Sequence, residues 1–140
     1  MILVCLSNSL SLTEVFPAVA ASIPRARSTV VEFARTVGFA DAELDALRLA
    51  VTEAVTNAVL HGFDTATGHV QLTAARAGDE IWVLVADDGC GFLHATRESC
   101  GLGWGLALIA EACDEFEIVE RAGGGTELRM RFTHAEPTFS

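Results

Sequence analysis

The 140-residue sequence contains no lysine, so its nine basic side chains are all arginines, against 19 aspartates and glutamates. The net charge of −10 excludes a general binder of nucleic acids or anionic membranes, because both ligands require a basic surface. No apolar run approaches the length of about eighteen residues that a membrane span needs, and no basic segment precedes the apolar start. We therefore expect no signal peptide and no transmembrane helix, and we expect partners that are proteins or small molecules.

The sequence also lacks a recognisable metal-binding pattern, because its four cysteines form no C-x-x-C pair and no zinc-like spacing with the four histidines. We expect reduced thiols in a cytoplasmic protein and no metal cluster. Cys90 and Cys100 flank a stretch without periodicity, where an oxidised pair would act as a switch, although inert buried thiols are the commoner case.

Apolar residues are abundant, at 51% of the total, and their patterns fit one globular domain over residues 1–140. Alternation with period two predicts strands, and apolar spacings of three and four predict helices. Pro17 ends the first strand, and Gly38 and Gly62 end the first two helices. The expected elements are a strand at 9–16, helices at 22–37 and 41–61 (the second capped by Asp41), strands at 69–76 and 81–86, a helix at 106–112, and strands at 115–121 and 126–132.

The helix predicted at 41–61 carries three polar side chains that a purely structural helix would not need. Glu53, Asn57 and His61 are spaced four residues apart, so on a helix they lie along one face. A buried carboxylate is costly unless it is paired or used, and a carboxamide one turn away is a good oxygen ligand for magnesium. This combination indicates phosphate chemistry. The alternative is a solvated polar stripe that ends in a cap at His61 and Gly62.

A second motif follows the strand predicted at 81–86. Asp87-x-Gly89-x-Gly91 places an acid at the end of a buried strand, before glycines that let the backbone approach a ligand closely. Such a carboxylate can accept a hydrogen bond from an exocyclic amine such as that of adenine. Taken alone, the motif fits a tight turn better, since Asp-Gly is common in turns.

A third motif, Gly101-x-Gly103-x-Gly105-Leu106, opens the last predicted helix. Free amides at a helix N-terminus, together with flexible glycines, form an anion site suited to polyphosphate. A dinucleotide-binding turn is excluded because Leu106 replaces the third glycine of G-x-G-x-x-G and no strand feeds the turn. Later in the chain, Thr126 follows a glycine and offers a hydroxyl at a strand start, which is informative only through its place in the order of motifs.

Taken in order, the motifs that begin at Glu53, Asp87, Gly101 and Gly125 resemble the N, G1, G2 and G3 boxes of the GHKL ATPase superfamily. The segment TEAVTNAVLHG at 52–62 is most similar to the small anti-sigma factor serine/threonine kinases of the sporulation and general stress type. The first predicted helix, with its PRAR segment, also fits, so the resemblance covers nearly the whole chain. It implies a Bergerat-type two-layer α/β sandwich, in which helices cover one face of a mixed, mostly antiparallel sheet.

The resemblance also assigns roles within an ATP site that a mobile lid closes. It implies that Asn57 holds Mg²⁺, that Glu53 activates the attacking hydroxyl and that Asp87 recognises adenine. Thr126 is expected to support Asp87 through water, and Arg97 is the only cation that the lid offers to the γ-phosphate. The other expected contacts are Gly89 and Gly91 in the adenine pocket, and Gly101, Gly103, Gly105 and Leu106 at the phosphates.

The function implied by the resemblance is that of an ATP- and Mg²⁺-dependent protein serine/threonine kinase acting as an anti-sigma factor. Such a protein binds a sigma factor and phosphorylates an anti-anti-sigma protein of the STAS type; a homodimer is left open. Two alternatives remain. One is a catalytically inactive nucleotide-binding module that sequesters a protein partner, and the other is a detached ATP-binding domain that phosphorylates a histidine on another chain.

Overall fold

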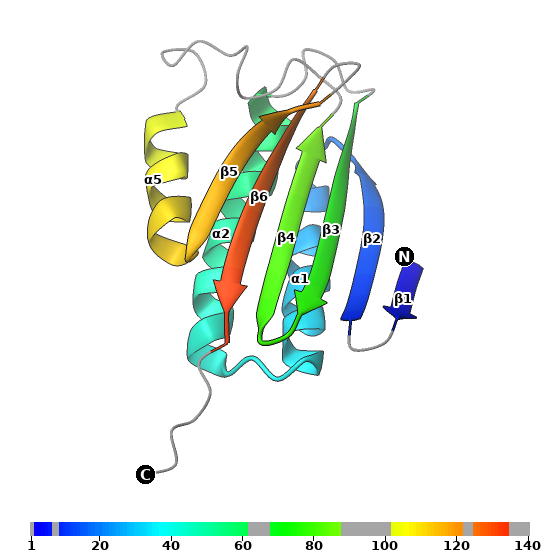
Figure 1. Ribbon diagram of the computed structural model, residues 1–140. Helices are drawn as coiled ribbons and strands as arrows, with labels where there is room; N and C mark the ends of the chain where they lie inside the picture. The colour runs from blue at the N-terminus through cyan, green and yellow to red at the C-terminus, as the bar shows by residue number, and fades with distance from the viewer. Residues whose placement is uncertain (1, 7–8, 62–67, 88–101, 122–124, 135–140) are drawn as a thin grey trace.

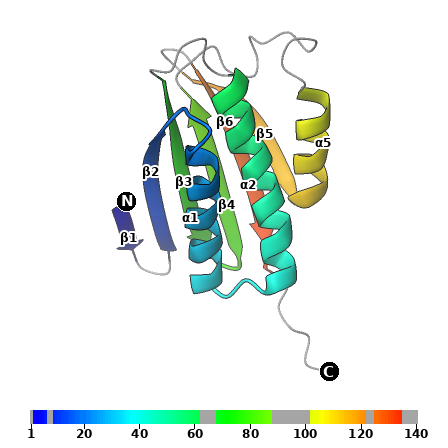
Figure 2. The same cartoon turned by 180° about the vertical axis from the view of Figure 1, so that it is seen from behind.

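The structure, a computed structural model, consists of two layers: a β-sheet and the helices that cover one of its faces (Figures 1 and 2). It describes residues 2–6, 9–61, 68–87, 102–121 and 125–134. This two-layer α/β sandwich confirms the fold class expected from the sequence. In chain order the described elements are β1 (Ile2–Leu6), β2 (Ser9–Pro17), α1 (Ser22–Thr36), α2 (Asp41–His61), β3 (His69–Ala77), β4 (Glu80–Asp87), α5 (Leu102–Ala112), β5 (Glu115–Glu120) and β6 (Thr126–Thr133).

Six strands form the sheet in the order β1-β2-β3-β4-β6-β5. All five pairings between neighbours are antiparallel, so the sheet expected to be mixed contains no parallel pair among the described strands. Three of these pairings, β1–β2, β3–β4 and β5–β6, join strands with no helix between them, so they need only short connections. The other two span longer segments, because α1 and α2 lie between β2 and β3 in the sequence, and α5 and β5 lie between β4 and β6.

The core lies between the sheet and the helices. Alternate side chains of β3, β4 and β6 are buried, as the period-two pattern predicts. On the helical side α2 lies between α1 and α5 and contacts both (Figure 2). Burial of one large aliphatic side chain contributes about 1.5–3 kcal/mol. The largest fully buried side chains are Phe16, Leu44, Leu47, Leu72, Ile81, Ile109, Leu128 and Met130.

The junction between α1 and α2 has well-defined caps. Gly38 adopts a φ of +102°, in the left-handed region that favours glycine, and its N–H donates to the carbonyl of Arg35. The expected cap of the next helix, Asp41, is instead its first residue. Glu43 Oε1 accepts the N–H of Ala40 at 2.8 Å, so the capping carboxylate comes from the first turn and not from Asp41.

Two further elements differ from the prediction. Strand β1 was not expected, because a short apolar run at 2–6 carries no periodicity that separates strand from helix. Helix α5 begins at Leu102, one turn earlier than predicted, so Gly103 and Gly105 lie inside its first turn. None of the helices among the described residues is both long and apolar enough to cross a membrane.

Candidate functional site

Four elements converge at one end of the molecule. Figure 1 shows that α2 and β4 end there, and that α5 and β6 begin there. The described residues of the polar motifs lie on these four elements or directly before them. The fold therefore gathers residues that are far apart in the sequence.

The central helix α2 supplies Glu53 and Asn57. Asn57 is only 6% exposed, and its Nδ2 finds no hydrogen-bond partner among the described residues. Glu53, one turn earlier, is half-buried. An unsatisfied buried polar group costs about 1–3 kcal/mol, so a bound ligand that accepts a hydrogen bond from Asn57 would recover part of that cost. The Oδ1 of the same carboxamide is the kind of hard oxygen that Mg²⁺ prefers.

The sheet supplies Asp87 and Thr126. They lie directly opposite each other in the β4–β6 pairing, at 1% and 0% exposure. Thr126 Oγ1 has no hydrogen-bond partner within the described part of the chain. Gly125 precedes it with a φ of +92° and accepts the N–H of Arg121, which closes the β5–β6 hairpin. The structure thus brings a buried carboxylate and a buried hydroxyl together on neighbouring strands.

Two arginine contacts, one to Asp87 and one to the residue before Glu53, were not predicted. Arg121 Nη1 donates to the backbone carbonyl of Asp87 at 3.4 Å. Arg27 Nη1, from α1, donates to Thr52 Oγ1 at 3.5 Å, next to Glu53 in the chain. The sequence offered no signal for either contact, because both join elements that lie far apart in the chain.

The glycine motifs are only partly within the described residues. Gly103 and Gly105 lie in the first turn of α5, where helical N–H groups have no partner within the helix. Leu106 follows them and packs half-buried against the core. His61 is the last residue of α2. Outside the described residues lie Gly89, Gly91, Arg97, Gly101, Cys90 and Cys100.

Comparison with known proteins identifies the class to which this sandwich fold and its buried polar groups belong. The sequence profile of the histidine kinase-like ATPase domain matches residues 16–132, and the chain belongs to this family. Among its relatives, the anti-sigma F factor of Thermoanaerobacter sp. (strain X514) is 32% identical over 115 residues, which cover 75% of this chain and 80% of that protein. The serine-protein kinase RsbW of Bacillus mycoides (strain KBAB4) is 30% identical over 121 residues, 76% of each chain. The predicted resemblance to anti-sigma kinases of the GHKL type is therefore confirmed.

Solved structures share the fold. The crystal structure of the RsbU and RsbW domains of a Mycobacterium tuberculosis protein superposes with a TM-score of 0.71 at 25% identity. The match covers 91% of this chain and 33% of that one, so this chain spans about a third of the longer protein. The histidine kinase domain of a blue-light-activated kinase from Erythrobacter litoralis is less similar, with a TM-score of 0.54 at 25% identity over 86% of this chain and 67% of that one.

Proposed function

We propose that this protein is an ATP- and Mg²⁺-dependent serine/threonine kinase that acts as an anti-sigma factor. In this proposal it binds a sigma factor and phosphorylates an anti-anti-sigma protein of the STAS type. The main support is the set of buried polar side chains, Asn57, Asp87 and Thr126, at the end of the molecule where α5 begins. Burial of such groups is unfavourable in a core and is explained by a polar ligand.

Each residue then has a chemical task. The Asp87 carboxylate accepts a hydrogen bond from the adenine amine, and Thr126, opposite it on the neighbouring strand, supports that carboxylate through water. Asn57 offers Oδ1 to Mg²⁺, and the first-turn amides of α5 face the phosphates. Glu53 takes the proton of the attacking hydroxyl. Bound Mg²⁺-ATP supplies the transferable phosphoryl group.

The family adds further residues to the proposal. Gly89 and Gly91 are assigned to the adenine pocket, Gly101 to the phosphates and Arg97 to the γ-phosphate, by their positions in the motifs. The names of the relatives, anti-sigma F factor and serine-protein kinase, support the pairing of sigma binding with phosphotransfer. We propose a cytoplasmic location on the same grounds.

The competing functions are a nucleotide-holding module without activity and a detached histidine-phosphorylating domain. Acid treatment of a phosphorylated product separates the second from the proposal, because phosphoserine survives acid and phosphohistidine does not. The inactive nucleotide-holding module is distinguished from the proposed kinase by a variant that keeps the shape of the site and removes its general base.

Glu53→Gln is that variant. We expect it to bind Mg²⁺-ATP and the sigma factor as the wild type does, and to phosphorylate the antagonist about 10²–10⁴-fold more slowly. The measurement is transfer of labelled phosphate from ATP to a purified candidate antagonist of the STAS type. Asn57→Ala is the contrasting variant, since it should lose magnesium-dependent nucleotide binding itself. The kinase proposal is wrong if Glu53→Gln transfers phosphate at the wild-type rate, or if the wild type transfers none to any cognate antagonist. In either case the inactive nucleotide-binding module takes its place.

A further inference from the structure

A small hollow lies on the face of the sheet opposite the helices, near the end where β4 stops (Figure 1). Its volume is about 360 Å³. The strand register explains why the surface is hollowed there. Ala86 of β4 offers only a methyl group beside Gln71 of β3, and Gly125, whose carbonyl accepts the N–H of Arg121, has no side chain. The residues that line the hollow are Val15, His69, Gln71, Ala86 and Arg121.

The lining of this hollow carries an excess of hydrogen-bond donors. Arg121 donates to the backbone carbonyl of Asp87 at 3.4 Å and forms no ion pair with any residue that the structure describes. His69 and Gln71 add an imidazole and a carboxamide, and both groups can donate an N–H. None of the described lining residues is acidic. In a chain with a net charge of −10, this local excess of donors favours an anionic ligand.

The carboxylate beside the hollow does not oppose an anion. Glu127 of β6 lies opposite Ala86 in the β4–β6 pairing, on the side away from Gln71. Its carboxylate pairs with Arg129 Nε at 2.7 Å, so its charge is compensated within the sheet.

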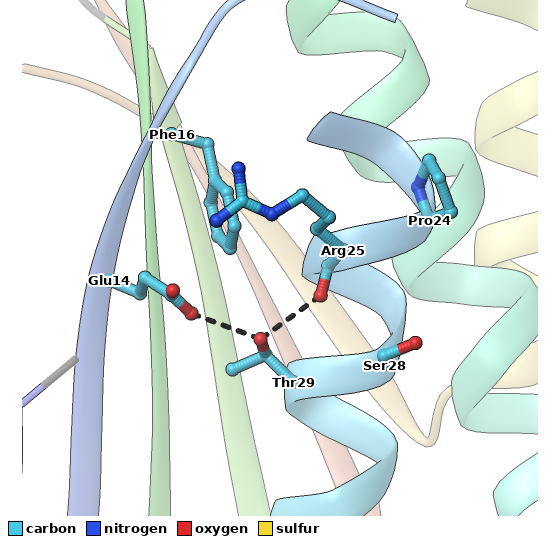
Figure 3. A pocket seen from close by; sticks show the side chains of 6 residues that line it. All are labelled: Glu14, Phe16, Pro24, Arg25, Ser28 and Thr29. Carbon is cyan, nitrogen blue, oxygen red and sulfur yellow. Dashed lines mark hydrogen bonds between the residues drawn. The ribbon is translucent and has the colours of Figure 1, made fainter. Parts of the chain in front are cut away.

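The hollow between α1 and β2 differs in this respect (Figure 3). A base and an acid line it together, and both contact the protein. The Arg25 guanidinium lies over the Phe16 ring, 5.6 Å from the ring centroid, and Glu14 accepts a hydrogen bond from Thr29 Oγ1 at 3.0 Å. The two charges balance, so that hollow offers no excess of either sign to a ligand.

The arrangement around Arg121 suits a compact tetrahedral oxyanion. A guanidinium presents its N–H groups in a rigid fork that matches the oxygens of phosphate and carboxylate. Here donors come from two sides, with Arg121 following β5 and with His69 and Gln71 on β3. A phosphate-type ion has acceptor oxygens pointing in several directions and can meet both sides, whereas a carboxylate presents two oxygens in one plane.

We propose that this hollow binds a small phosphate-type oxyanion between Arg121 and His69, and that the bound anion weakens nucleotide binding through Arg121. A charge-assisted hydrogen bond to the anion is stronger than the long bond to the Asp87 carbonyl, so the guanidinium is drawn away from the end of β4. The Asp87 side chain lies on the helical face with Thr126, so the two ligands occupy opposite faces of the sheet. The effect on nucleotide rests on the proposed function, and the anion site does not.

Sulfate is the probe for the anion site, because it is a tetrahedral dianion that stays soluble with magnesium. In the nucleotide-free 140-residue protein, the NMR signals of Arg121 Nε–H and of the Gln71 side-chain amide should shift with sulfate at constant ionic strength. The shifts should saturate, with a midpoint in the millimolar range expected for a few solvent-exposed contacts. Acetate should bind at least about fivefold more weakly, the equivalent of one such contact.

Two variants remove the site by different means. Arg121→Gln removes the charge and should weaken sulfate binding about tenfold or more, and Ala86→Leu fills the hollow without changing any charge and should abolish binding. Arg129→Gln is the matched control, because it removes a guanidinium that is already paired with Glu127, and it should leave the titration unchanged. Circular dichroism confirms that each variant is folded.

Four results would overturn the anion site. They are no response of Arg121 and Gln71 to sulfate, a response confined to the first-turn amides of α5, acetate binding as tight as sulfate binding, and an equal loss of binding in Arg129→Gln and Arg121→Gln.

The effect on nucleotide is measured by calorimetric titration of ATP with and without saturating sulfate at equal ionic strength. Sulfate should lower the ATP affinity of the wild type by up to about fivefold, the value of one weak hydrogen bond, and should leave that of Arg121→Gln unchanged. An equal decrease in both proteins would mean direct competition at the phosphate positions, and no decrease in the wild type would mean no coupling; either result overturns the second half of the proposal. If the wild type binds no ATP, the coupling and the proposed function fail together, while the anion site is still decided by its own titration.

Discussion

Asp87, the last residue of β4, lies directly opposite Thr126, the first residue of β6, and neither residue is more than 1% exposed. The carboxylate expected to recognise adenine therefore has a hydroxyl beside it on the same rung of the sheet. The register of the β4–β6 pairing places these two residues opposite each other. A shift by one residue would place one of the two side chains on the opposite face.

This relationship predicts the effect of Asp87→Asn. A buried acceptor matched to the adenine amine would become an amide with the wrong hydrogen-bonding pattern, which costs about 1–3 kcal/mol of ATP affinity. The wild type should bind GTP poorly, because guanine presents a carbonyl at the corresponding position. Isothermal titration with both nucleotides checks this, with Thr126→Ser as the control that keeps a hydroxyl. Equal wild-type affinities for ATP and GTP would contradict the role given to Asp87.

Arg121 should affect nucleotide binding without touching the nucleotide. Its guanidinium donates to the Asp87 carbonyl at 3.4 Å, so Arg121→Ala removes a donor that holds the end of β4. We expect ATP affinity to fall by up to about fivefold, the value of one weak hydrogen bond, with the phosphotransfer rate at saturating ATP unchanged. Arg121→Lys should restore part of the affinity. Arg129→Ala is the control, since Arg129 instead pairs with Glu127 at 2.7 Å. An equal loss of ATP affinity in Arg129→Ala would show that Arg121 has no specific role.

Cys113 should make the stability pH-dependent on the alkaline side. Burial raises the pKa of its thiol above the ordinary value. In the unfolded chain the thiol ionises first, above about pH 8.5, so the unfolded state then binds fewer protons and the free energy of unfolding falls as pH rises further. Urea unfolding between pH 7 and 10 should show this loss in the wild type and a smaller loss in Cys113→Ala. Parallel curves would mean that Cys113 ionises equally easily in both states.

His134 should stabilise the junction between the last strand and α2. Its Nδ1 lies 2.9 Å from Glu43 Oε1, and its ring stacks on Phe39 with 5.2 Å between centroids. His134→Ala should cost about 0.5–1.5 kcal/mol of unfolding free energy, because a hydrogen bond and an apolar contact are both lost. A double-mutant cycle with Glu43→Gln measures the interaction free energy between His134 and Glu43. Additive effects of the two substitutions would show that the pair contributes nothing beyond its members.

The sequence was sufficient to predict most of the fold. The apolar patterns located β3, β4, β5 and β6 to within one residue at each end. Alternate side chains of β3, β4 and β6 are buried, and the side chains of β5 mostly alternate between exposed and half-buried. The patterns failed for β1, whose short apolar run has no such alternation. They also placed the start of α5 too late, since Gly103 and Gly105 lower helix propensity, although a first turn tolerates them better than a helix interior.

The site was predictable as a set of motifs but not as an arrangement. The sequence motifs marked Asn57 and Asp87, and the order of the motifs marked Thr126; all three residues are buried in the structure. Their juxtaposition depends on the strand order, which local periodicity does not encode. The contacts of Arg27 and Arg121 were missed for the same reason, because an arginine on a helix or in a hairpin has no sequence mark that separates a tertiary contact from a solvated side chain.

The strand order has a consequence for how the chain folds. The hairpins β1–β2, β3–β4 and β5–β6 close short loops, so each can form early at little entropic cost. The β4–β6 pairing joins the second hairpin to the third across α5, so we expect it to form later than the hairpins themselves. Asp87 and Thr126 meet in that pairing. A chain that stalls before it would therefore hold most of its secondary structure and yet be unable to recognise its nucleotide.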